Sequence, residues 1–368
     1  MDKEAPIREL AIRNYKEAGR PVPRSYARVH GAKMADAILK GKAGGYHADY
    51  KLFFVMNANP INQFPVAQKW VEALDKLEFM VVFEQFMTAT ARFADIILPT
   101  STLLERNDVI AGGATPFYGY LKKVIEPVGE TRSQYNICQA LAERLGIKDY
   151  AEQTEDELLR HTIMAEGSPV TDWETFKEKA IYRLKLPEPY VAFKEQIEDP
   201  ENNPFPTDSG KIEIYSQELA DMKNPLLPPI PKWFYPEEFI NDPMIEKYPL
   251  QLITSRFKRR AHTQFDTIPW LRELEENRVM VNADDAKARG IKNGDMVRVF
   301  SDCGEIMISA EVTERIMPGV VDVPQGAWFK PDENGVDRGG CPNVLQKDAT
   351  SPCGSFVWST SLVQVEKA

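Results

Sequence analysis

The feature that most constrains the fold is a concentration of proline in the second half of the chain. Of 368 residues, twelve prolines lie between Pro187 and Pro249. Proline fixes φ and removes a backbone donor, so this stretch excludes long helices and central strands. It also carries aromatic residues, in which disordered chains are poor, so we expect an ordered connecting segment, residues 151–247, that wraps over other parts of the protein. These aromatic residues are Tyr190, Phe193, Phe205, Tyr215, Trp233, Phe234 and Tyr235.

Before this segment, short apolar runs alternate with helical patterns. Runs at 51–57, 79–83 and 94–99 predict short buried strands, and the amphipathic stretch 66–77 predicts a helix. A further helix is predicted over 132–145, closed by Gly146. This order is typical of parallel β-α-β units, whose ligands bind at the carboxyl ends of the strands. The polar residues expected at those ends are Asn57, Asn59, Glu84 and Thr88.

From about residue 248 the pattern changes to short β segments joined by turns. Strands are predicted at 250–254, 278–282, 295–300, 305–312 and 319–324. Asn282 is suited to cap a brief helix, and Gly290 is suited to close it. These features predict a compact β-barrel of about 120 residues.

Composition and charge exclude several classes of protein. A net charge of −10 without a basic block disfavours binding to nucleic acid or to a membrane surface. No apolar run reaches the roughly 18 residues that would span a bilayer. Residues 1–10 have no apolar signal core, so the localisation stays open. The four cysteines and four histidines are scattered, which makes an iron–sulfur cluster or a zinc site within this chain unexpected. The cysteines are Cys138, Cys303, Cys341 and Cys353.

The stretch from 81 to 108 carries the sharpest local signal. Glu84, Thr88 and Thr90 gather where a predicted strand ends, which suits polar recognition of a ligand. A carboxylate at Glu84 can accept both hydrogen bonds that the N1–H and N2–H₂ edge of guanine offers. The alternative interpretation is an ordinary strand, helix and strand of the core.

The same stretch resembles the molybdopterin-dependent oxidoreductases of the dimethyl sulfoxide reductase type. In that family a strand is followed by an acidic residue, F-M-T, small residues and A-D-x-x-L-P. Residues 57–60 are similar to the family's G-x-N-P turn, with Asn57 where the family has glycine. The residues that match the longer pattern are Glu84, Phe86, Met87, Thr88, Ala91, Ala94, Asp95, Leu98, Pro99 and Glu105.

The second half extends the resemblance, which then covers residues 51–368. Segments 256–266, 281–300 and 323–329 look like the family's dinucleotide-binding barrel, and 339–345 is similar to its anaerobic dimethyl sulfoxide reductase branch. The resemblance implies an α/β plus β fold. A partial Rossmann-like three-layer α/β domain over 1–150 is followed by the connecting segment and a double-psi β-barrel over 248–368.

The resemblance also implies the cofactor, a bis(molybdopterin guanine dinucleotide) that carries molybdenum. In this interpretation Asn57, Asn59, Glu84 and Thr88 face one guanosine diphosphate arm. Contacts from the barrel are expected from Arg260, His262, Thr263, Gln325 and Asn343. Structural alternatives are a solvated basic patch at Arg260, a core histidine at His262, and loop-stabilising amides at Gln325 and Asn343. Ser359 and Ser361 occupy positions where the family has His and Asn.

The chain begins in the middle of the family's sequence pattern. The molybdenum ligand and the cluster cysteines are therefore expected in a missing N-terminal half or a complementary subunit. We expect the C-terminal cofactor-binding part of a catalytic subunit that reduces an S-oxide, N-oxide or related acceptor. By itself it should hold no cofactor tightly and have no reductase activity. Family partners are an iron–sulfur electron-transfer subunit and a membrane anchor, and the family branch is often exported. The alternative is a non-catalytic binding module or cofactor carrier. A hydrolase is disfavoured because neither G-x-S-x-G nor H-E-x-x-H occurs.

Overall fold

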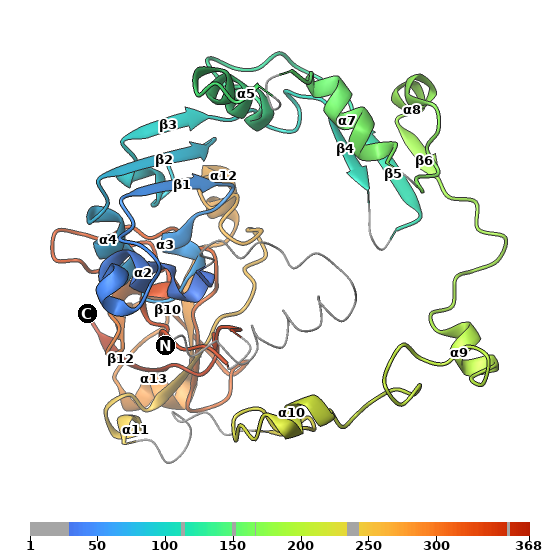
Figure 1. The fold of residues 1–368 in the computed structure, drawn as a ribbon. Coiled ribbons are helices and arrows are strands. Elements are labelled where there is room, and N and C mark those ends of the chain that lie inside the picture. The colour runs from blue at the N-terminus through green and yellow to red at the C-terminus, as the bar shows by residue number, and fades with distance from the viewer. Residues whose placement is uncertain (1–28, 112–114, 149–151, 166, 234–242, 352–353) are drawn as a thin grey trace. The chain divides into compact units, whose positions relative to one another are not determined.

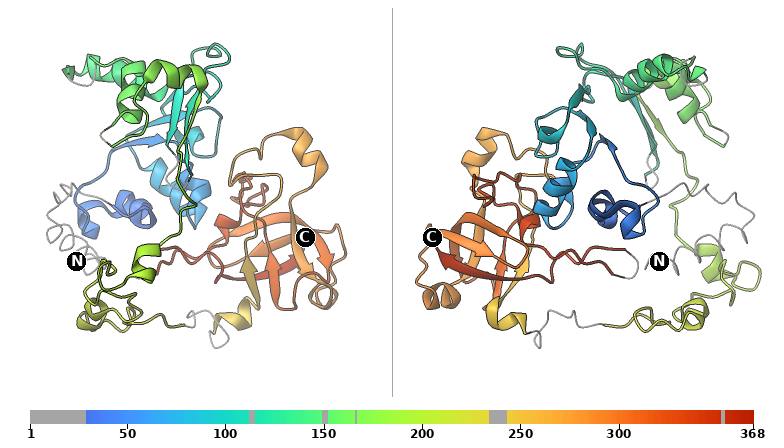
Figure 2. Two further views of the ribbon diagram at one scale, coloured as in Figure 1. Left: turned by 90° about the vertical axis from the view of Figure 1, so that its right-hand side faces the viewer. Right: turned by 60° about the vertical axis from the view of Figure 1, so that its left-hand side comes forward.

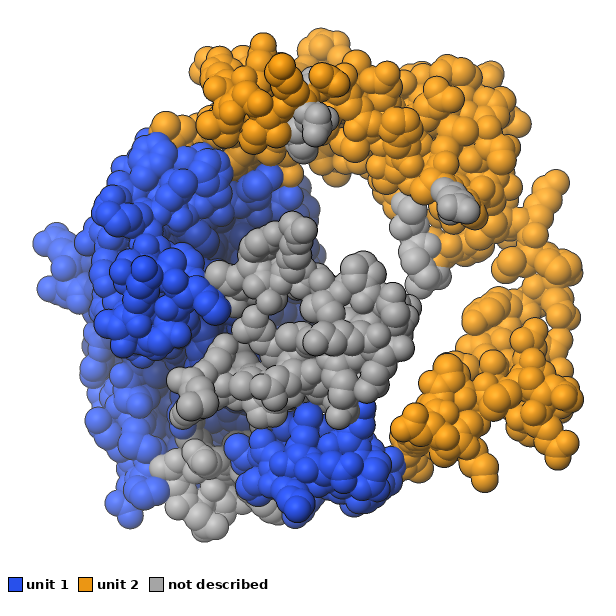
Figure 3. All heavy atoms as spheres, viewed as in Figure 1, with its two compact units in different colours: residues 1–81, 87–95, 215–368 blue, residues 82–86, 96–214 orange. Residues whose placement is uncertain are grey.

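The computed structural model describes residues 29–111, 115–148, 152–165, 167–233, 243–351 and 354–368. Phe234, Tyr235, Cys353 and the first 28 residues of the predicted α/β domain lie outside the described residues. The chain divides into two compact units (Figure 3). The first comprises 1–81, 87–95 and 215–368, and the second comprises 82–86 and 96–214. Every helix within the described ranges is too short or too polar to cross a bilayer.

A small three-stranded sheet follows the first helices of the chain. Its strands β1 (Leu52–Met56), β2 (Phe79–Glu84) and β3 (Ile96–Pro99) are paired in the order β1-β2-β3, and their arrows point the same way in Figure 1. Helix α4 (Ala67–Asp75) joins β1 to β2, as the amphipathic pattern predicted. The other helical segments are η1 (Gly31–Lys33), α2 (Met34–Lys40), η2 (Gly41–Gly44), α3 (Pro60–Gln63) and η3 (Ala91–Phe93).

Strand β1 is not the buried strand that its apolar run predicted. Leu52, Phe54 and Met56 alternate along one face and are 51%, 44% and 42% exposed, whereas Val55 on the other face is only 3% exposed. Successive side chains of a strand point to opposite faces, so a run that is apolar throughout needs cover on both. Among the described residues, only the face of β1 that carries Val55 is covered by other parts of the chain.

The C-terminal part forms a closed six-stranded barrel (Figure 2). Its strands are paired in the order β10-β8-β11-β7-β12-β9. The pairs β10·β8 and β11·β7 are parallel, with Ser309 opposite Arg278 and Val320 opposite Gln251, and the other pairs are antiparallel. The strands are β7 (Leu250–Ile253), β8 (Arg278–Asn282), β9 (Met296–Phe300), β10 (Glu305–Thr313), β11 (Val320–Asp322) and β12 (Leu362–Lys367). A closed barrel is confirmed, and its double-psi topology stays a prediction.

The interior of the barrel is filled by apolar side chains that alternate with more exposed ones along each strand. Val279 and Val281 of β8, and Val297 and Val299 of β9, are fully buried, while their neighbours along each strand are more exposed. Asn282 caps the predicted brief helix by accepting from the Asp284 backbone N–H at 2.9 Å. The helices described in residues 215–368 are α10 (Gln217–Asp221), α11 (Met244–Lys247), α12 (Pro269–Leu274), α13 (Ala283–Ala288) and η4 (Pro342–Val344).

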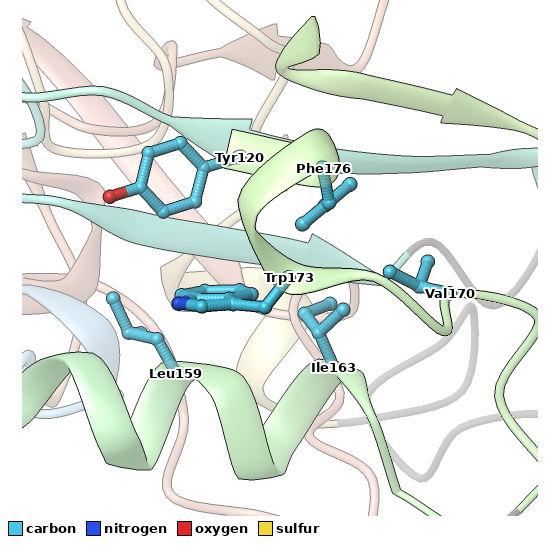
Figure 4. Close-up of a cluster of buried hydrophobic side chains, with 6 residues drawn as sticks. All are labelled: Tyr120, Leu159, Ile163, Val170, Trp173 and Phe176. Carbon is cyan, nitrogen blue, oxygen red and sulfur yellow. The ribbon is translucent and has the colours of Figure 1, made fainter. Parts of the chain in front are cut away.

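The second unit contains an antiparallel sheet with helices packed against it. Its strands β4 (Asp108–Ala111), β5 (Phe117–Leu121) and β6 (Ile181–Arg183) are paired in the order β4-β5-β6. Leu159 and Ile163 rise from α7 (Glu155–Ile163) toward Trp173 of α8 (Trp173–Lys179), which meets Tyr120 of β5 edge-on (Figure 4). The buried cluster is Tyr120, Leu159, Ile163, Val170, Trp173 and Phe176.

The helix predicted over 132–145 is confirmed as α5 (Gln134–Arg144). Ser133 caps its start by accepting from the Asn136 backbone N–H, and Gly146 follows its end at φ +72°. The described part of the proline-rich stretch lacks long helices and strands, as predicted, while its wrapping over other parts of the protein stays a prediction. Between Pro187 and Pro249 the described helices, α9 (Lys194–Glu198), α10 and α11, have at most five residues, and the described part has no strand.

Candidate functional site

A cavity of about 520 Å³ opens among the loops of the barrel unit. Four segments contribute to it: α3, the loop after β7, the loop after β11, and η4 with the chain that follows it to β12. The lining contains no Asp, Glu, Lys or Arg residue. The lining residues are Asn62, Gln63, Thr254, His262, Thr263, Gln325, Gly326, Pro342, Asn343, Gln346, Trp358 and Ser359.

Two of these loops touch along their backbones. The Gln325 N–H donates to the Ser255 carbonyl at 2.9 Å, and Arg256 and Gln325 form a parallel bridge. At Gly326, whose φ is +94°, a Cβ atom would lie 1.8 Å from the His262 carbonyl oxygen. Only glycine therefore permits this approach. His262 itself has φ +55°, an uncommon conformation for a residue with a side chain.

The loop that leads into η4, and so to the cavity residues Pro342 and Asn343, is held in place by a buried carboxylate. Asp337 is fully buried and accepts from the backbone N–H groups of Lys330 at 2.6 Å, Gly339 at 3.1 Å and Cys341 at 2.7 Å. Burial raises the pKa of Asp337, and these donors counteract that rise. The loop then reaches Asn343, whose Nδ2 donates to the Phe64 carbonyl at 3.0 Å and so joins the loop to the end of α3.

Several polar side chains of the cavity have unused hydrogen-bonding capacity. Four hydroxyl, amide or imidazole groups make no hydrogen bond to another described residue. Gln346 is 2% exposed and donates from Nε2 to the Trp358 carbonyl at 3.1 Å, yet its Oε1 is buried without a partner. A buried acceptor left unpaired costs free energy, so such a group in a cavity wall is suited to a ligand donor. Among the described residues, the cavity side chains that have no hydrogen-bond partner include those of Thr254, His262, Thr263 and Gln325.

The indole of Trp358 gives the cavity an aromatic wall. Trp358 is 36% exposed and is held by Phe356, with the ring centroids 4.8 Å apart. Neutral amides and hydroxyls beside an aromatic face suit a polar heterocycle, because they offer both donors and acceptors to its edge and a surface to its ring.

Four of the predicted site residues line this cavity together: His262, Thr263, Gln325 and Asn343. Arg260 does not line it. Its side chain is 3% exposed and donates to Asp266 at 2.9 Å and to Asn277 at 2.8 Å. It borders a separate cavity of about 240 Å³.

The predicted residues near β1 are used within the fold. Asn57 follows β1 at φ +53°, which explains why the family turn has glycine here and why asparagine is accepted. Asn59 is buried, accepting from Thr90 Oγ1 at 2.7 Å and donating to Asn62 Oδ1 at 3.3 Å. Thr88 is buried and accepts from the Ala91 N–H at 3.1 Å. These bonds orient α3, which carries two of the cavity residues.

Glu84 ends β2 in the other unit. Its Oε1 accepts from the Gln85 backbone N–H at 2.7 Å, and its carbonyl accepts from the Thr100 N–H. Nearby in the sequence, Glu105 accepts from the backbone N–H groups of Thr102 at 2.6 Å and Val128 at 2.7 Å. These donors lower the pKa of Glu105. The family motif residue Glu105 therefore organises its own loop.

Sequence reasoning missed several lining residues. Asn62 and Gln63 lie two and three residues beyond the turn at 57–60 that the motif singled out, and this position was the available signal. Trp358 and Gln346 had no local signal, because their role depends on how the last loop folds back. Of the two serines at the family's His and Asn positions, Ser359 lines the cavity, whereas Ser361 is buried and accepts from the Lys347 N–H at 3.0 Å. Within the described ranges there is no cluster of three or more His, Cys, Asp or Glu residues suited to a metal.

Two family models match this chain. One, described as molybdopterin oxidoreductase, matches residues 11–144, and the other, described as molydopterin dinucleotide binding domain, matches residues 250–356. The second match contains most of the lining residues of the cavity. The chain belongs to the molybdopterin oxidoreductase family. The cofactor of this family, a molybdopterin guanine dinucleotide with molybdenum, is the one that the resemblance implied.

Curated relatives place the chain within the dimethyl sulfoxide reductase type. It is 38% identical to the dimethyl sulfoxide reductase DmsA of Escherichia coli K12, over 83% of this chain and 40% of that protein. It is 36% identical to DmsA of Haemophilus influenzae, over 79% of this chain and 38% of that protein. It is 34% identical to the dimethyl sulfoxide/trimethylamine N-oxide reductase of Cereibacter sphaeroides, over 87% of this chain and 42% of that protein. The chain thus spans about 40% of the length of these relatives.

A solved structure has the same fold. Acetylene hydratase from Pelobacter acetylenicus superposes with a TM-score of 0.76 at 23% identity, over 92% of this chain and 47% of that one. At this identity the likeness concerns the fold alone.

Proposed function

We propose that this chain binds a molybdopterin guanine dinucleotide of a molybdenum reductase, and that the barrel cavity holds a heterocyclic part of it. One observation carries the proposal. Unused hydrogen-bonding groups from separate loops converge on a single cavity that is lined by no Asp, Glu, Lys or Arg residue and has an aromatic wall. A core site that served only stability would pair a buried acceptor such as Gln346 Oε1 internally.

The chemistry of the ligand matches these groups. Guanine and pterin share a 2-amino-4-oxopyrimidine ring, which presents N–H donors beside a carbonyl acceptor. The Gln346 Oε1 atom is an acceptor without a partner, and Thr263, Gln325 and His262 offer both kinds of group. A neutral amide can therefore read the edge of either ring, and the Trp358 indole can cover its face.

When bound, the cofactor supplies the molybdenum at which a two-electron oxygen-atom transfer occurs. The residues of this chain bind and orient it. Gln346 and Gln325 fix the heterocycle in its plane, and Trp358 excludes water from one face. Because the loops are joined through Gly326 and Asn343, these contacts are set before the ligand arrives, which lowers the entropy cost of binding.

The role of the whole protein is also a proposal. The relatives are named as reductases of dimethyl sulfoxide and trimethylamine N-oxide, which supports a catalytic subunit for S- or N-oxides. We propose that Glu84 reads the guanine edge of one guanosine diphosphate arm, the arm to which Asn57, Asn59 and Thr88 are also assigned. The domain boundaries, the inactivity of the chain by itself, and the iron–sulfur and membrane-anchor subunits remain predictions.

Calorimetric titration of the purified chain with guanosine monophosphate and with 6-hydroxymethylpterin tests the cavity. We expect at least one to bind with a Kd of about 10 to 1,000 μM, the range for ligands of this size. Gln346→Met keeps the length of the side chain but removes both polar groups, so it should weaken binding about tenfold. Gln364→Met, on strand β12 of the same barrel, is the matched control and should bind like the wild type. Equal binding by the two variants would contradict the assignment of Gln346, and no binding of either probe to the wild type would contradict the cavity.

A further inference from the structure

The loop that carries His262 and Thr263 is anchored from behind by a buried carboxylate. Asp266 is 7% exposed and accepts from Arg260 at 2.9 Å and from Arg272 at 2.8 Å. Its Oδ2 atom also accepts from the Trp328 backbone N–H at 3.1 Å. One side chain thus joins the loop after β7 to the loop after β11, which are two walls of the cavity.

Trp328 completes the connection. Its indole Nε1–H donates to the Thr263 carbonyl at 2.7 Å. Trp328 therefore links Asp266 to Thr263, a residue of the cavity wall that lies three positions before Asp266. In this loop, His262, just before Thr263, and Phe265, just before Asp266, have φ +55° and +73°. Left-handed backbone at two residues with side chains costs free energy and persists only where surrounding contacts enforce it. Asp266 and Trp328 supply those contacts.

Arg260 explains why the carboxylate stays in place. Its guanidinium is 3% exposed, lies 4.1 Å from the centroid of the Phe257 ring, and also donates to Asn277 at 2.8 Å. A charge buried to this degree needs a paired partner, and removal of one partner of such a pair is strongly destabilising. Arg260 and Asp266 therefore hold each other, and neither lines the cavity.

We propose that Asp266, held by Arg260, is a positioning residue for the cofactor: through Trp328 it fixes the loop that presents His262 and Thr263 to the cavity. This inference rests on the proposed function, because it takes the cavity to be the ligand site. It assigns Arg260 to the support of that site. The ligand class is unchanged, a 2-amino-4-oxopyrimidine heterocycle.

The test compares two carboxylates of the same barrel unit in the full chain. Asp285 pairs with Arg289 and accepts from the Gly319 backbone N–H at 2.7 Å, so it resembles Asp266 in its contacts, yet it lies outside the cavity lining. Asp266→Asn and Asp285→Asn should both lower the melting temperature. Only Asp266→Asn should weaken binding of the tighter of the two probes, guanosine monophosphate or 6-hydroxymethylpterin, by tenfold or more.

A spectroscopic signature separates positioning from stability. The indole N–H of Trp328, assigned with Trp328→Phe in a ¹⁵N spectrum, should shift in Asp266→Asn and stay unchanged in Asp285→Asn. Should Asp266→Asn fail to fold, Trp328→Phe itself decides, because it keeps the backbone N–H that donates to Asp266, removes the indole N–H that donates to Thr263, and should weaken binding several-fold. A folded Asp266→Asn with unchanged affinity, or an unchanged affinity in Trp328→Phe, overturns the proposal.

Failure of the two proposals is distinguishable. If neither probe binds the wild-type chain, the proposed function fails, and the Trp328 signal still reports on the loop. An unshifted Trp328 indole in folded Asp266→Asn would then overturn the anchoring of the loop as well. A shifted indole would support it.

Discussion

Gly326→Ala is the substitution that most sharply tests how the cavity is built. Glycine at this position has φ +94°, and an added Cβ would lie 1.8 Å from the His262 carbonyl oxygen. Ordinary contact begins near 3.4 Å, so the two loops must separate by about 1.6 Å. The left-handed backbone costs about 1–2 kcal/mol with a side chain, and overpacking adds about 1–3 kcal/mol. We therefore expect a loss of about 2–5 kcal/mol in the free energy of unfolding.

Gly319→Ala is the matched control. Gly319 belongs to the same barrel and has φ +80°, but a Cβ there would meet nothing within 4 Å. This variant should lose only the backbone term of about 1–2 kcal/mol. Urea unfolding measures both losses, and titration with guanosine monophosphate and 6-hydroxymethylpterin measures the effect on the cavity. Gly326→Ala should weaken binding at least tenfold, and Gly319→Ala should leave it unchanged. Equal losses of stability and equal affinities in the two variants would refute the reasoning.

Four further predictions follow from single residues or segments. In an enzyme assembled with the rest of its sequence, Glu84→Gln should lower the amount of guanosine monophosphate released by acid hydrolysis about ten- to a hundredfold. The reason is that the glutamine NH₂ group would face one of the two N–H donors of guanine, where the carboxylate offers an acceptor. Unchanged nucleotide content would show that Glu84 does not read guanine. Burial raises the pKa of the Cys341 thiol, so iodoacetamide should label Cys341 in guanidinium but not in the native protein, as peptide mass spectrometry can check. Backbone donors lower the pKa of Glu105 below its ordinary 4.5, so the contribution of its carboxylate to stability is present above that pH and is lost as the pH falls below it. Glu105→Gln should therefore remove that part of the pH dependence of the melting temperature. Identical pH profiles of the melting temperature in the variant and the wild type would contradict this prediction. A chain that starts at Tyr248 should fold by itself as a barrel, with a cooperative thermal transition by circular dichroism, since the barrel is closed without the preceding residues.

Local patterns predicted the elements of this fold well. Alternation located five of the six barrel strands, and Asn282 and Gly290 bounded the helix between β8 and β9. These signals are local, because capping and alternation depend on residues close in sequence. The exposure of Leu52, Phe54 and Met56 does not follow from the local pattern of β1, because whether a face of a strand is covered depends on distant segments.

The candidate site was predictable only where its residues belong to the segments that carry the family resemblance. His262, Thr263, Gln325 and Asn343 meet in the structure as the resemblance implied, but their meeting depends on the approach of Gly326 to His262 and on Asp337. Arg260 shows the limit of residue-by-residue reasoning. Its charge suggested a phosphate, yet its geometry commits it to Asp266 and Asn277. Side-chain partners of this kind follow from tertiary packing, which spacing in the sequence does not encode.

The central claim, that the barrel cavity binds a 2-amino-4-oxopyrimidine heterocycle, is tested most directly by the indole signals of the tryptophans. A ¹⁵N spectrum of the full chain, with Trp358 assigned through Trp358→Phe, should be recorded as guanosine monophosphate or 6-hydroxymethylpterin is added. We predict that the Trp358 indole signal shifts with saturation, because its ring lines the cavity, while that of Trp173, buried in the other unit, does not. An unmoved Trp358 signal at millimolar concentrations of both probes would contradict the account.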